Sequence, residues 1–110
     1  TCVRDYIHVM DLAEAHSAAL LHLFNNDPML LNLNIGTGKG TSVLELVNTF
    51  KRVNKCNIPF KFVERRPGDV SSLVADNSLA NRTIDWSPKR NLEKMCLDGC
   101  RWQKNNPNGF

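Results

Sequence analysis

The sequence predicts an α/β fold in which short, mostly parallel strands alternate with about four helices. Two observations carry this prediction. Apolar residues recur at the spacing of an amphipathic helix in several segments, and three of these segments begin with a helix-capping residue. Short β-rich or alternating runs lie between them, and strands that alternate with helices are typical of a partly parallel sheet. The 110 residues, 42% hydrophobic and 23% charged, suit one small folded domain or a piece of one.

The first part of the chain predicts two strands and one helix. Residues 6–9 form a short β-rich run. Asp11 then stands at a helix-capping position, and Glu14 three residues later completes a capping box. We expect this helix to end in the polar stretch 25–28. In residues 31–35 Leu and Ile alternate with Asn, which indicates a strand.

The middle of the chain contains the clearest helical signal. Residues 36–40 are rich in glycine and predict a tight turn. Ser42 and Glu45 then form a second capping box, and the apolar face that follows ends near Asn54. Residues 59–63 contain aromatic and β-branched side chains, so we expect a third strand there.

The last part of the chain predicts two more helices. A short extended stretch at residues 73–74 precedes Asp76, which we expect to cap a helix that continues to Ile84. After a turn at residues 87–88, a final helix is expected over residues 91–103. Its inward-facing side chains are predicted to be those of Leu92, Met95, Cys96 and Trp102.

Charge and composition exclude several classes of protein. The net charge is only +3, and no block of Lys and Arg is interleaved with aromatic residues, so we expect no nucleic acid partner. The longest apolar run, residues 18–24, is far shorter than the ~20 residues of a membrane span. Neither the cysteines nor the histidines have the spacing of a zinc site, so we expect free thiols, no metal and a cytoplasmic protein. The opening at Thr1, without Met or a leader pattern, is typical of a processed or truncated chain.

The strongest candidate site is the sequence Arg-Arg-Pro-Gly-Asp at residues 65–69, where the third expected strand ends and the Pro-Gly pair predicts a rigid turn. A guanidinium group can bind a phosphate through two parallel charge-assisted hydrogen bonds. A carboxylate a few residues away can accept hydrogen bonds from a sugar diol. The combination indicates a site for something like a nucleoside diphosphate, and the alternative is a solvated cluster of charges in a loop.

Other motifs do not match known phosphate-binding or catalytic patterns. In the glycine turn Lys39 is followed by Gly40, whereas a P-loop requires Ser or Thr after its Lys, and the third glycine comes one residue early for a dinucleotide fingerprint. A turn that uses the conformational freedom of glycine is therefore favoured. A complete catalytic set is also missing, because the only tyrosine, Tyr6, is followed four residues later by Met10 rather than by Lys.

Four segments together resemble the C-terminal third of UDP-glucose 4-epimerase, a family in the extended short-chain dehydrogenase/reductase superfamily. They are residues 3–13 (VRDYIHVMDLA), 34–43 (NIGTGKGTSV), 64–69 (ERRPGD) and 102–110 (WQKNNPNGF). The resemblance implies the C-terminal, UDP-sugar-binding part of a Rossmann-type epimerase over residues 1–110, with Phe110 near the family's natural terminus. In the family NAD removes hydride, the 4-keto sugar turns over, and hydride returns to the opposite face, which inverts C4 reversibly.

The resemblance also implies residue roles. Arg4 and Arg66 match the arginines that hold the UDP diphosphate, and Asp69 matches the aspartate that holds the ribose. Leu73 stands where a tyrosine accompanies restriction to UDP-glucose and UDP-galactose, and a small residue accompanies acceptance of N-acetylated sugars. The fingerprint for NAD and the Tyr-x-x-x-Lys pair belong to the N-terminal half in the family, so this chain alone is expected neither to bind NAD nor to catalyse.

Two alternatives remain open on the sequence. One is a sister enzyme, such as a UDP-glucuronate epimerase or decarboxylase. The other is a non-catalytic UDP-sugar-binding or assembly module. We also expect a homodimer formed by strand pairing or element exchange, because Ile7, Leu33 and Ile35 lie in strands whose neighbours the chain does not supply.

Overall fold

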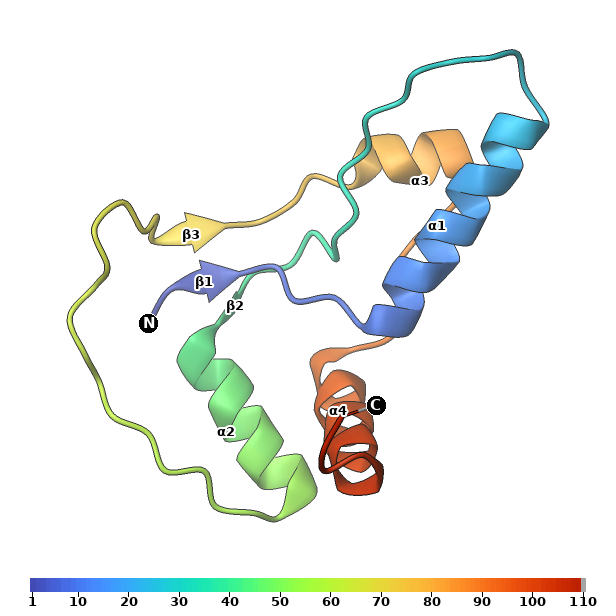
Figure 1. The fold of residues 1–110 in the computed structure, drawn as a ribbon. Helices are drawn as coiled ribbons and strands as arrows, with labels where there is room; N and C mark the ends of the chain where they lie inside the picture. Colours follow the sequence, from blue (N-terminus) through green and yellow to red (C-terminus); the bar gives the residue numbers. More distant parts are fainter. Residues whose placement is uncertain (110) are drawn as a thin grey trace.

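The computed structural model describes residues 1–109 and confirms the α/β class, with four helices and a small sheet (Figure 1). Phe110, the expected terminus of the family, lies outside the described residues. In chain order the elements are β1 (Val3–Arg4), α1 (Val9–Phe24), β2 (Thr41–Ser42), α2 (Val43–Asn54), β3 (Ser72–Leu73), α3 (Ser78–Ile84) and α4 (Leu92–Asn105).

The sheet has three strands in the order β2-β1-β3, so the first strand lies in the centre. β1 pairs with β2 in antiparallel and with β3 in parallel, which makes the sheet mixed where mostly parallel strands were expected. Arg4 is opposite Thr41 on one side and opposite Leu73 on the other. Each ladder is only two residues long, so other contacts must help to fix the central strand.

Two helices begin where the sequence predicts: α2 follows the predicted capping box at Ser42, and α4 begins beside Asn91, the expected start of the last helix. The Ser42 hydroxyl accepts a hydrogen bond from the Glu45 amide at 3.1 Å, and α2 ends at Asn54 as expected. The Asn91 side chain accepts from the Lys94 amide at 3.0 Å, which satisfies a free donor in the first turn of α4.

Asp76 precedes the N-cap residue of α3 and stabilises the start of this helix. Asn77 occupies the N-cap position and makes no side-chain capping bond, whereas the Asp76 carboxylate accepts hydrogen bonds from the amide and hydroxyl of Ser78. The expected helix from this region to Ile84 is confirmed, with its cap one residue later than predicted.

The predicted cap of α1 is wrong. The helix begins at Val9 with His8 at its N-cap, where His8 Nδ1 accepts from the Met10 amide at 3.0 Å. Asp11 is fully buried inside the first turn. Its carboxylate binds the backbone amides of Lys89 and Arg90 and forms an ion pair with the Arg90 guanidinium. A distant loop therefore uses the carboxylate that the local pattern assigned to capping.

Three predicted strands are not strands in the structure. Residues 6–8 link β1 to α1, and residues 31–35 and 59–63 adopt no regular structure. Alternation at 31–35 reflects burial rather than pairing, because Leu33 and Ile35, with Ile7, pack against the apolar core. A strand requires a hydrogen-bonded neighbour, and β1, β2 and β3 pair only with one another in the part of the chain that the structure describes.

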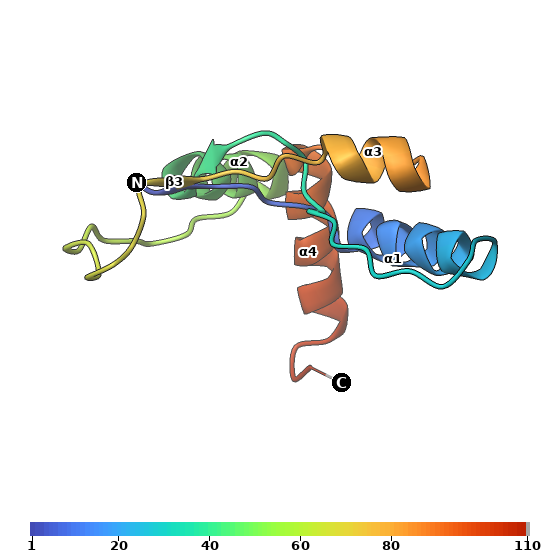
Figure 2. The same ribbon diagram turned by 90° about the horizontal axis from the view of Figure 1, so that it is seen from above.

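The core lies mainly between α1 and α3. Its buried members are Ala15, Ala80, Ile84 and Trp86. Elsewhere α2 packs against α4, where Cys96 is buried as predicted and its carbonyl accepts from the Asn54 side chain at 3.1 Å. The view from above shows α4 pointing away from the layer that contains the sheet, α2 and α3 (Figure 2). Trp102, expected to face inward, is 44% exposed on the outer part of α4.

The chain is open in shape. Its radius of gyration is 16.7 Å, whereas a compact domain of about 100 residues has a radius of about 13 Å. Large apolar side chains are exposed on and beside α1, among them Phe24 and Leu30, which is 91% exposed. None of the helices within residues 1–109 has the length and hydrophobicity of a membrane span. The chain thus leaves much apolar surface uncovered by its own residues.

Candidate functional site

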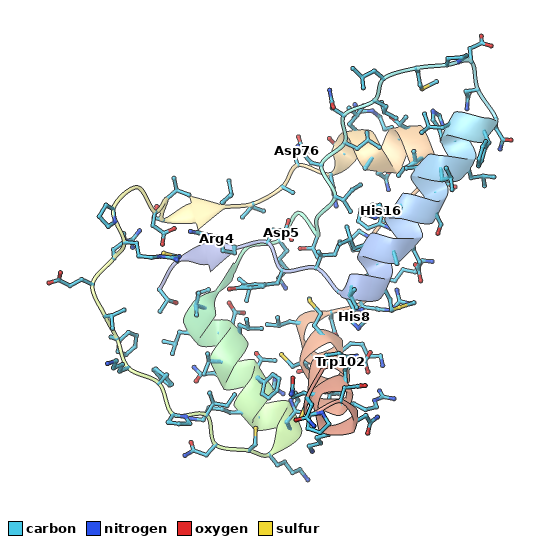
Figure 3. All side chains as sticks on the ribbon, in the orientation of Figure 1. Arg4, Asp5, His8, His16, Asp76 and Trp102 are labelled. Atoms are coloured by element: carbon cyan, nitrogen blue, oxygen red, sulfur yellow. The ribbon has the colours of Figure 1, made fainter. Side chains whose placement is uncertain are left out.

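Two of the predicted site residues meet at the carboxylate of Asp69. Arg4 Nη2 donates to Asp69 Oδ1 at 2.6 Å, and Arg66 Nη2 lies 3.7 Å from Asp69 Oδ2. The Cys2 thiol also donates to Oδ2 at 3.5 Å. Arg4 projects from the central strand, as Figure 3 shows, while Arg66 lies in the long segment that connects α2 to β3. The structure therefore joins residues 65 positions apart into one charged cluster, which we call the Arg4–Asp69–Arg66 cluster.

A tight turn brings Arg66 and Asp69 together. The Asp69 amide donates to the Arg66 carbonyl at 3.1 Å, and Gly68 has φ +79°. Pro67 and Gly68 thus occupy the second and third positions of a type II turn, which favours proline at the first of these and requires a positive φ at the next. The Pro-Gly turn predicted from the sequence is confirmed.

The two arginines differ in their surroundings. Arg66 has a side chain that is 86% exposed, whereas the side chains of Arg4 and Asp69 are 26% and 20% exposed. The ion pair between Arg4 and Asp69 is therefore better shielded from water than the pair between Arg66 and Asp69. Arg66 can turn toward a ligand at little cost in free energy. Exposed ion pairs contribute little stability, so Arg66 is better suited to binding a ligand than to holding the fold together.

A cavity of about 650 Å³ opens beside the cluster. This volume lies within the range of about 300–1,000 Å³ that is typical of small-molecule sites. Its lining includes cationic and aromatic side chains together, namely Arg4, Lys61, Arg65, Arg66, Tyr6 and Phe62. Such a lining can bind an anionic group and an aromatic or sugar ring side by side.

Asp69 is ionised under ordinary conditions. The hydrogen bond from the Cys2 thiol, followed by the charges of Arg4 and Arg66, outweighs partial desolvation and lowers the pKa of this carboxyl. An ionised carboxylate only accepts hydrogen bonds. Asp69 can therefore receive hydroxyl donors while the two arginines supply donors for phosphate oxygens.

Leu73 lies near the cluster but outside the larger cavity. It is opposite Arg4 on β3, its side chain is 62% exposed, and it lines a second cavity of about 400 Å³. Arg4 lines both cavities. Of the four residues predicted for the site, Arg4, Arg66 and Asp69 gather around one cavity, and Arg4 connects them to the space beside Leu73.

Asp5 is a residue that the sequence reasoning did not identify. One carboxylate oxygen accepts from the amide of Thr37 at 2.8 Å and from its hydroxyl, and the other accepts from the amides of Gly38 at 2.9 Å and Ala75 at 3.3 Å. Partial burial raises the pKa of Asp5, but these hydrogen bonds, led by those from Thr37, outweigh burial and lower it. No spacing rule links an aspartate at position 5 to a turn 32 residues later.

The glycine turn is therefore structural. Its amides at Thr37 and Gly38 donate to the protein's own Asp5. A side chain at Gly36 would place Cβ only 2.6 Å from both Asp5 Oδ2 and Ala75 Cβ, so this glycine allows close approach of backbone segments. These residues do not fit a dinucleotide, because the amides that would hold its phosphates are already bonded within the protein.

A second charged cluster surrounds Asp98 on α4. Because His8 Nδ1 accepts from the Met10 amide, His8 Nε2 carries the proton and donates to Asp98 at 3.0 Å. Hydrogen bonds from Lys94 and then His8, together with the charges of Lys94 and Arg101, lower the pKa of Asp98 to about 2. This cluster joins the start of α1 to α4. Within residues 1–109 no three His, Cys, Asp or Glu side chains gather closely enough to hold a metal ion.

Comparison with known proteins finds a match to a broad family model and matches to individual enzymes. A family model described as GDP-mannose 4,6 dehydratase matches residues 1–98. The UDP-glucose 4-epimerases of Bacillus subtilis and Haemophilus influenzae are 48% and 49% identical over 110 residues, and each match covers 100% of this chain and 32% of the relative. The chain thus spans about a third of the length of these curated relatives.

A solved structure agrees with the sequence comparison. The crystal structure of UDP-glucose 4-epimerase from Bifidobacterium longum, in complex with NAD+ and UDP, matches 100% of this chain and 32% of its own chain. The TM-score is 0.91 at 39% sequence identity. The resemblance to UDP-glucose 4-epimerases is confirmed, and the chain belongs to the nucleotide-sugar enzyme family whose model is described as GDP-mannose 4,6 dehydratase.

Proposed function

We propose that this chain is the C-terminal, UDP-sugar-binding third of a UDP-glucose 4-epimerase. The parent enzyme would interconvert UDP-glucose and UDP-galactose in the cytoplasm by reversible inversion at C4. The observation that carries the proposal is the Arg4–Asp69–Arg66 cluster at the edge of a cavity large enough for a nucleotide sugar. The match of this whole chain to 32% of an epimerase structure in complex with NAD+ and UDP supports it.

The groups of the cluster are suited to the diphosphate and the ribose of a nucleoside diphosphate. Arg4 and Arg66 supply guanidinium donors for the diphosphate oxygens, and guanidinium groups bind such oxygens in pairs. Asp69 supplies acceptors for the ribose hydroxyls. Arg4 donates to Asp69 at 2.6 Å, so the carboxylate also sets the direction of this guanidinium. Two positive charges then act as an anchor at the UDP end of the substrate.

Such an anchor agrees with the chemistry of C4 inversion. The hexose must present opposite faces to the same hydride donor. The enzyme must therefore hold the substrate by groups other than the reacting ring. Binding energy at the UDP end can retain the 4-keto intermediate while the ring turns. NAD supplies and receives the hydride in the parent enzyme, and the residues of this chain contribute binding and orientation of UDP.

Leu73 is proposed to flank the sugar. It stands opposite Arg4 on the neighbouring strand and lines the cavity that Arg4 shares. Leucine has a smaller side chain than tyrosine and lacks a hydroxyl, so the choice between unmodified and N-acetylated hexoses would depend on the space that it leaves. A panel of both sugar types on the parent enzyme measures this choice.

A sister activity is the second candidate, because the family model that matches residues 1–98 is described as a GDP-mannose dehydratase. An enzyme of that type would share the diphosphate anchor and differ in the base and the sugar. Turnover of UDP-galactose, of UDP-glucuronate and of GDP-mannose by the same protein separates these candidates. Conversion of UDP-galactose to UDP-glucose supports the epimerase.

The test uses a chimera of the Bacillus subtilis epimerase in which this chain replaces the 110 residues that it matches. We expect the chimera to interconvert UDP-galactose and UDP-glucose, and the 110-residue chain alone to show neither conversion nor retained NAD. An inactive chimera that folds and fails to bind UDP would overturn the proposal, and so would activity of the isolated chain.

Adjacent arginines provide a matched pair of variants in this chimera. We expect Arg66→Ala to weaken UDP binding by about 1.5–3 kcal/mol, the range for a hydrogen bond to a charged group. Arg65→Ala should have a smaller effect, because Arg65 does not take part in the ion pairs of Asp69. Calorimetric titration with UDP compares them, and an equal or larger loss at Arg65 would assign the anchor to the other arginine.

We also propose that the isolated chain forms a homodimer. Its exposed apolar residues on α1 and the exposed strand β3 support this proposal. The sequence suggested a dimer because Ile7, Leu33 and Ile35 would lie in unpaired strands. That reason does not hold, because these three residues pack against the chain's own core.

A further inference from the structure

We propose that Asp5 is the positioning residue for the diphosphate anchor, because it holds the strand that bears Arg4 in register with both of its neighbours. The inference rests on the proposed UDP site. Within residues 1–109 the hydrogen bonds of the Asp5 carboxylate all go to Thr37, Gly38 and Ala75. Asp5 lines the smaller cavity beside Leu73 but not the larger cavity beside the Arg4–Asp69–Arg66 cluster. Its effect on UDP would therefore pass through Arg4, the adjacent residue.

The need for such a residue follows from the short ladders. β1 has only two residues, and β2 and β3 each pair with it over two positions. Two-stranded pairs of this length are marginal without further support. An arginine at the end of such a strand can change direction with a small rotation of the backbone, and a displacement of about 1 Å at a binding group is enough to reduce function.

Asp5 supplies that support one residue beyond Arg4. Its first carboxylate oxygen binds the Thr37 amide at 2.8 Å, on the segment that leads into β2. Its second oxygen binds the Ala75 amide at 3.3 Å, on the segment that leaves β3. One side chain thus ties the segments next to both outer strands to the central strand, beyond the end of the two ladders. Figure 3 shows Asp5 beside Arg4.

The surrounding backbone is shaped around this carboxylate. Gly36 would meet Asp5 Oδ2 and Ala75 Cβ at 2.6 Å if it carried a side chain. Its carbonyl accepts from the Asn77 side chain at 2.9 Å, which holds the start of α3 to the same point. Two segments distant in the sequence, residues 36–38 and 75–77, therefore converge on Asp5, immediately beside the anchor.

The experiment is a double-mutant cycle in the chimera described above, with UDP titrated by calorimetry. We expect Asp5→Asn to weaken UDP binding by about tenfold, since an amide cannot accept all of these donors and presents a donor of its own. In an Arg4→Ala background the same substitution should have almost no further effect, because the positioned group is gone. An equal loss in both backgrounds would overturn the inference and leave Asp5 a purely structural residue.

Steady-state kinetics provide a second readout. Arg4 would hold the diphosphate equally in the ground state and the transition state, so Asp5→Asn should raise KM and leave kcat unchanged. Thr37→Val is the milder variant if Asp5→Asn does not fold, because it removes the hydroxyl bonds to Asp5 and to the Lys39 backbone but keeps the amide bond from Thr37 to Asp5. It should raise KM in the same direction, and an unchanged KM in a folded Thr37→Val protein would overturn the inference.

Asp11→Asn is the matched control. Like Asp5, Asp11 binds backbone amides through its carboxylate, but those amides belong to Lys89 and Arg90 beside α4, and Asp11 also pairs with the Arg90 guanidinium. This variant should lower thermal stability without changing UDP affinity. A loss of affinity equal to that of Asp5→Asn would mean that general destabilisation is responsible. Failure of the unsubstituted chimera to bind UDP would instead overturn the proposed function, and this inference with it.

Discussion

Gly68→Ala tests whether the turn between Arg66 and Asp69 forms the anchor. Gly68 has φ +79°, and a Cβ added there would meet no atom within 4 Å. The substitution therefore introduces no clash, and its whole effect comes from holding an L-residue in the left-handed region. That conformation costs about 1–2 kcal/mol.

The free protein can relieve this strain by opening the turn, and Arg66 then leaves its position 3.7 Å from Asp69. UDP binding must close the turn again, so the cost of the left-handed conformation is subtracted from the binding free energy. With about 1.4 kcal/mol for each factor of ten, we expect the affinity of the chimera for UDP to fall by about 5- to 30-fold. Calorimetric titration measures this change directly.

Gly109→Ala is the matched control for backbone strain. Gly109 has φ +82°, it also has open space around its Cβ position, and it ends a turn in which its amide donates to Asn106 at 3.0 Å. The same type of strain is thus introduced outside the cavity beside the Arg4–Asp69–Arg66 cluster, and UDP affinity should not change. An unchanged affinity in Gly68→Ala, or an equal loss in Gly109→Ala, would refute the reasoning.

Two further predictions concern the fold. The pKa of Asp98 is lowered to about 2, against about 3.9 in an unfolded chain, so its contribution to stability is present above pH ~4 and is lost as the pH falls toward 2. The thermal midpoint of the natural chain should therefore fall more between pH 5 and pH 2.5 than that of Asp98→Asn, and parallel curves would contradict the assignment. Light scattering of the isolated chain over a range of concentrations should give a mass above 12.4 kDa, whereas a monomer throughout would exclude the proposed homodimer.

The sequence by itself determined the features that depend on neighbours within about four residues. The capping of α2 by Ser42 and Glu45 and the type II turn at Pro67 and Gly68 were both predictable, because each is stabilised by short-range hydrogen bonds that residue type alone makes favourable. The arginine and aspartate chemistry of residues 65–69 was predictable for the same reason, since it depends on which groups are present in one segment.

Only the tertiary structure decided which distant groups meet. Arg4 reaches Asp69 across 65 residues, Asp5 binds the turn at Thr37, and Asp11 leaves its expected capping role to bind the loop before α4. The same limit explains the three strands that the pattern predicted wrongly. Alternating apolar residues report that one side of a segment is covered, and a helix can cover it as well as a paired strand can, as it does for Leu33. Pairing and ion-pair partners depend on the path of the whole chain, which no local pattern contains.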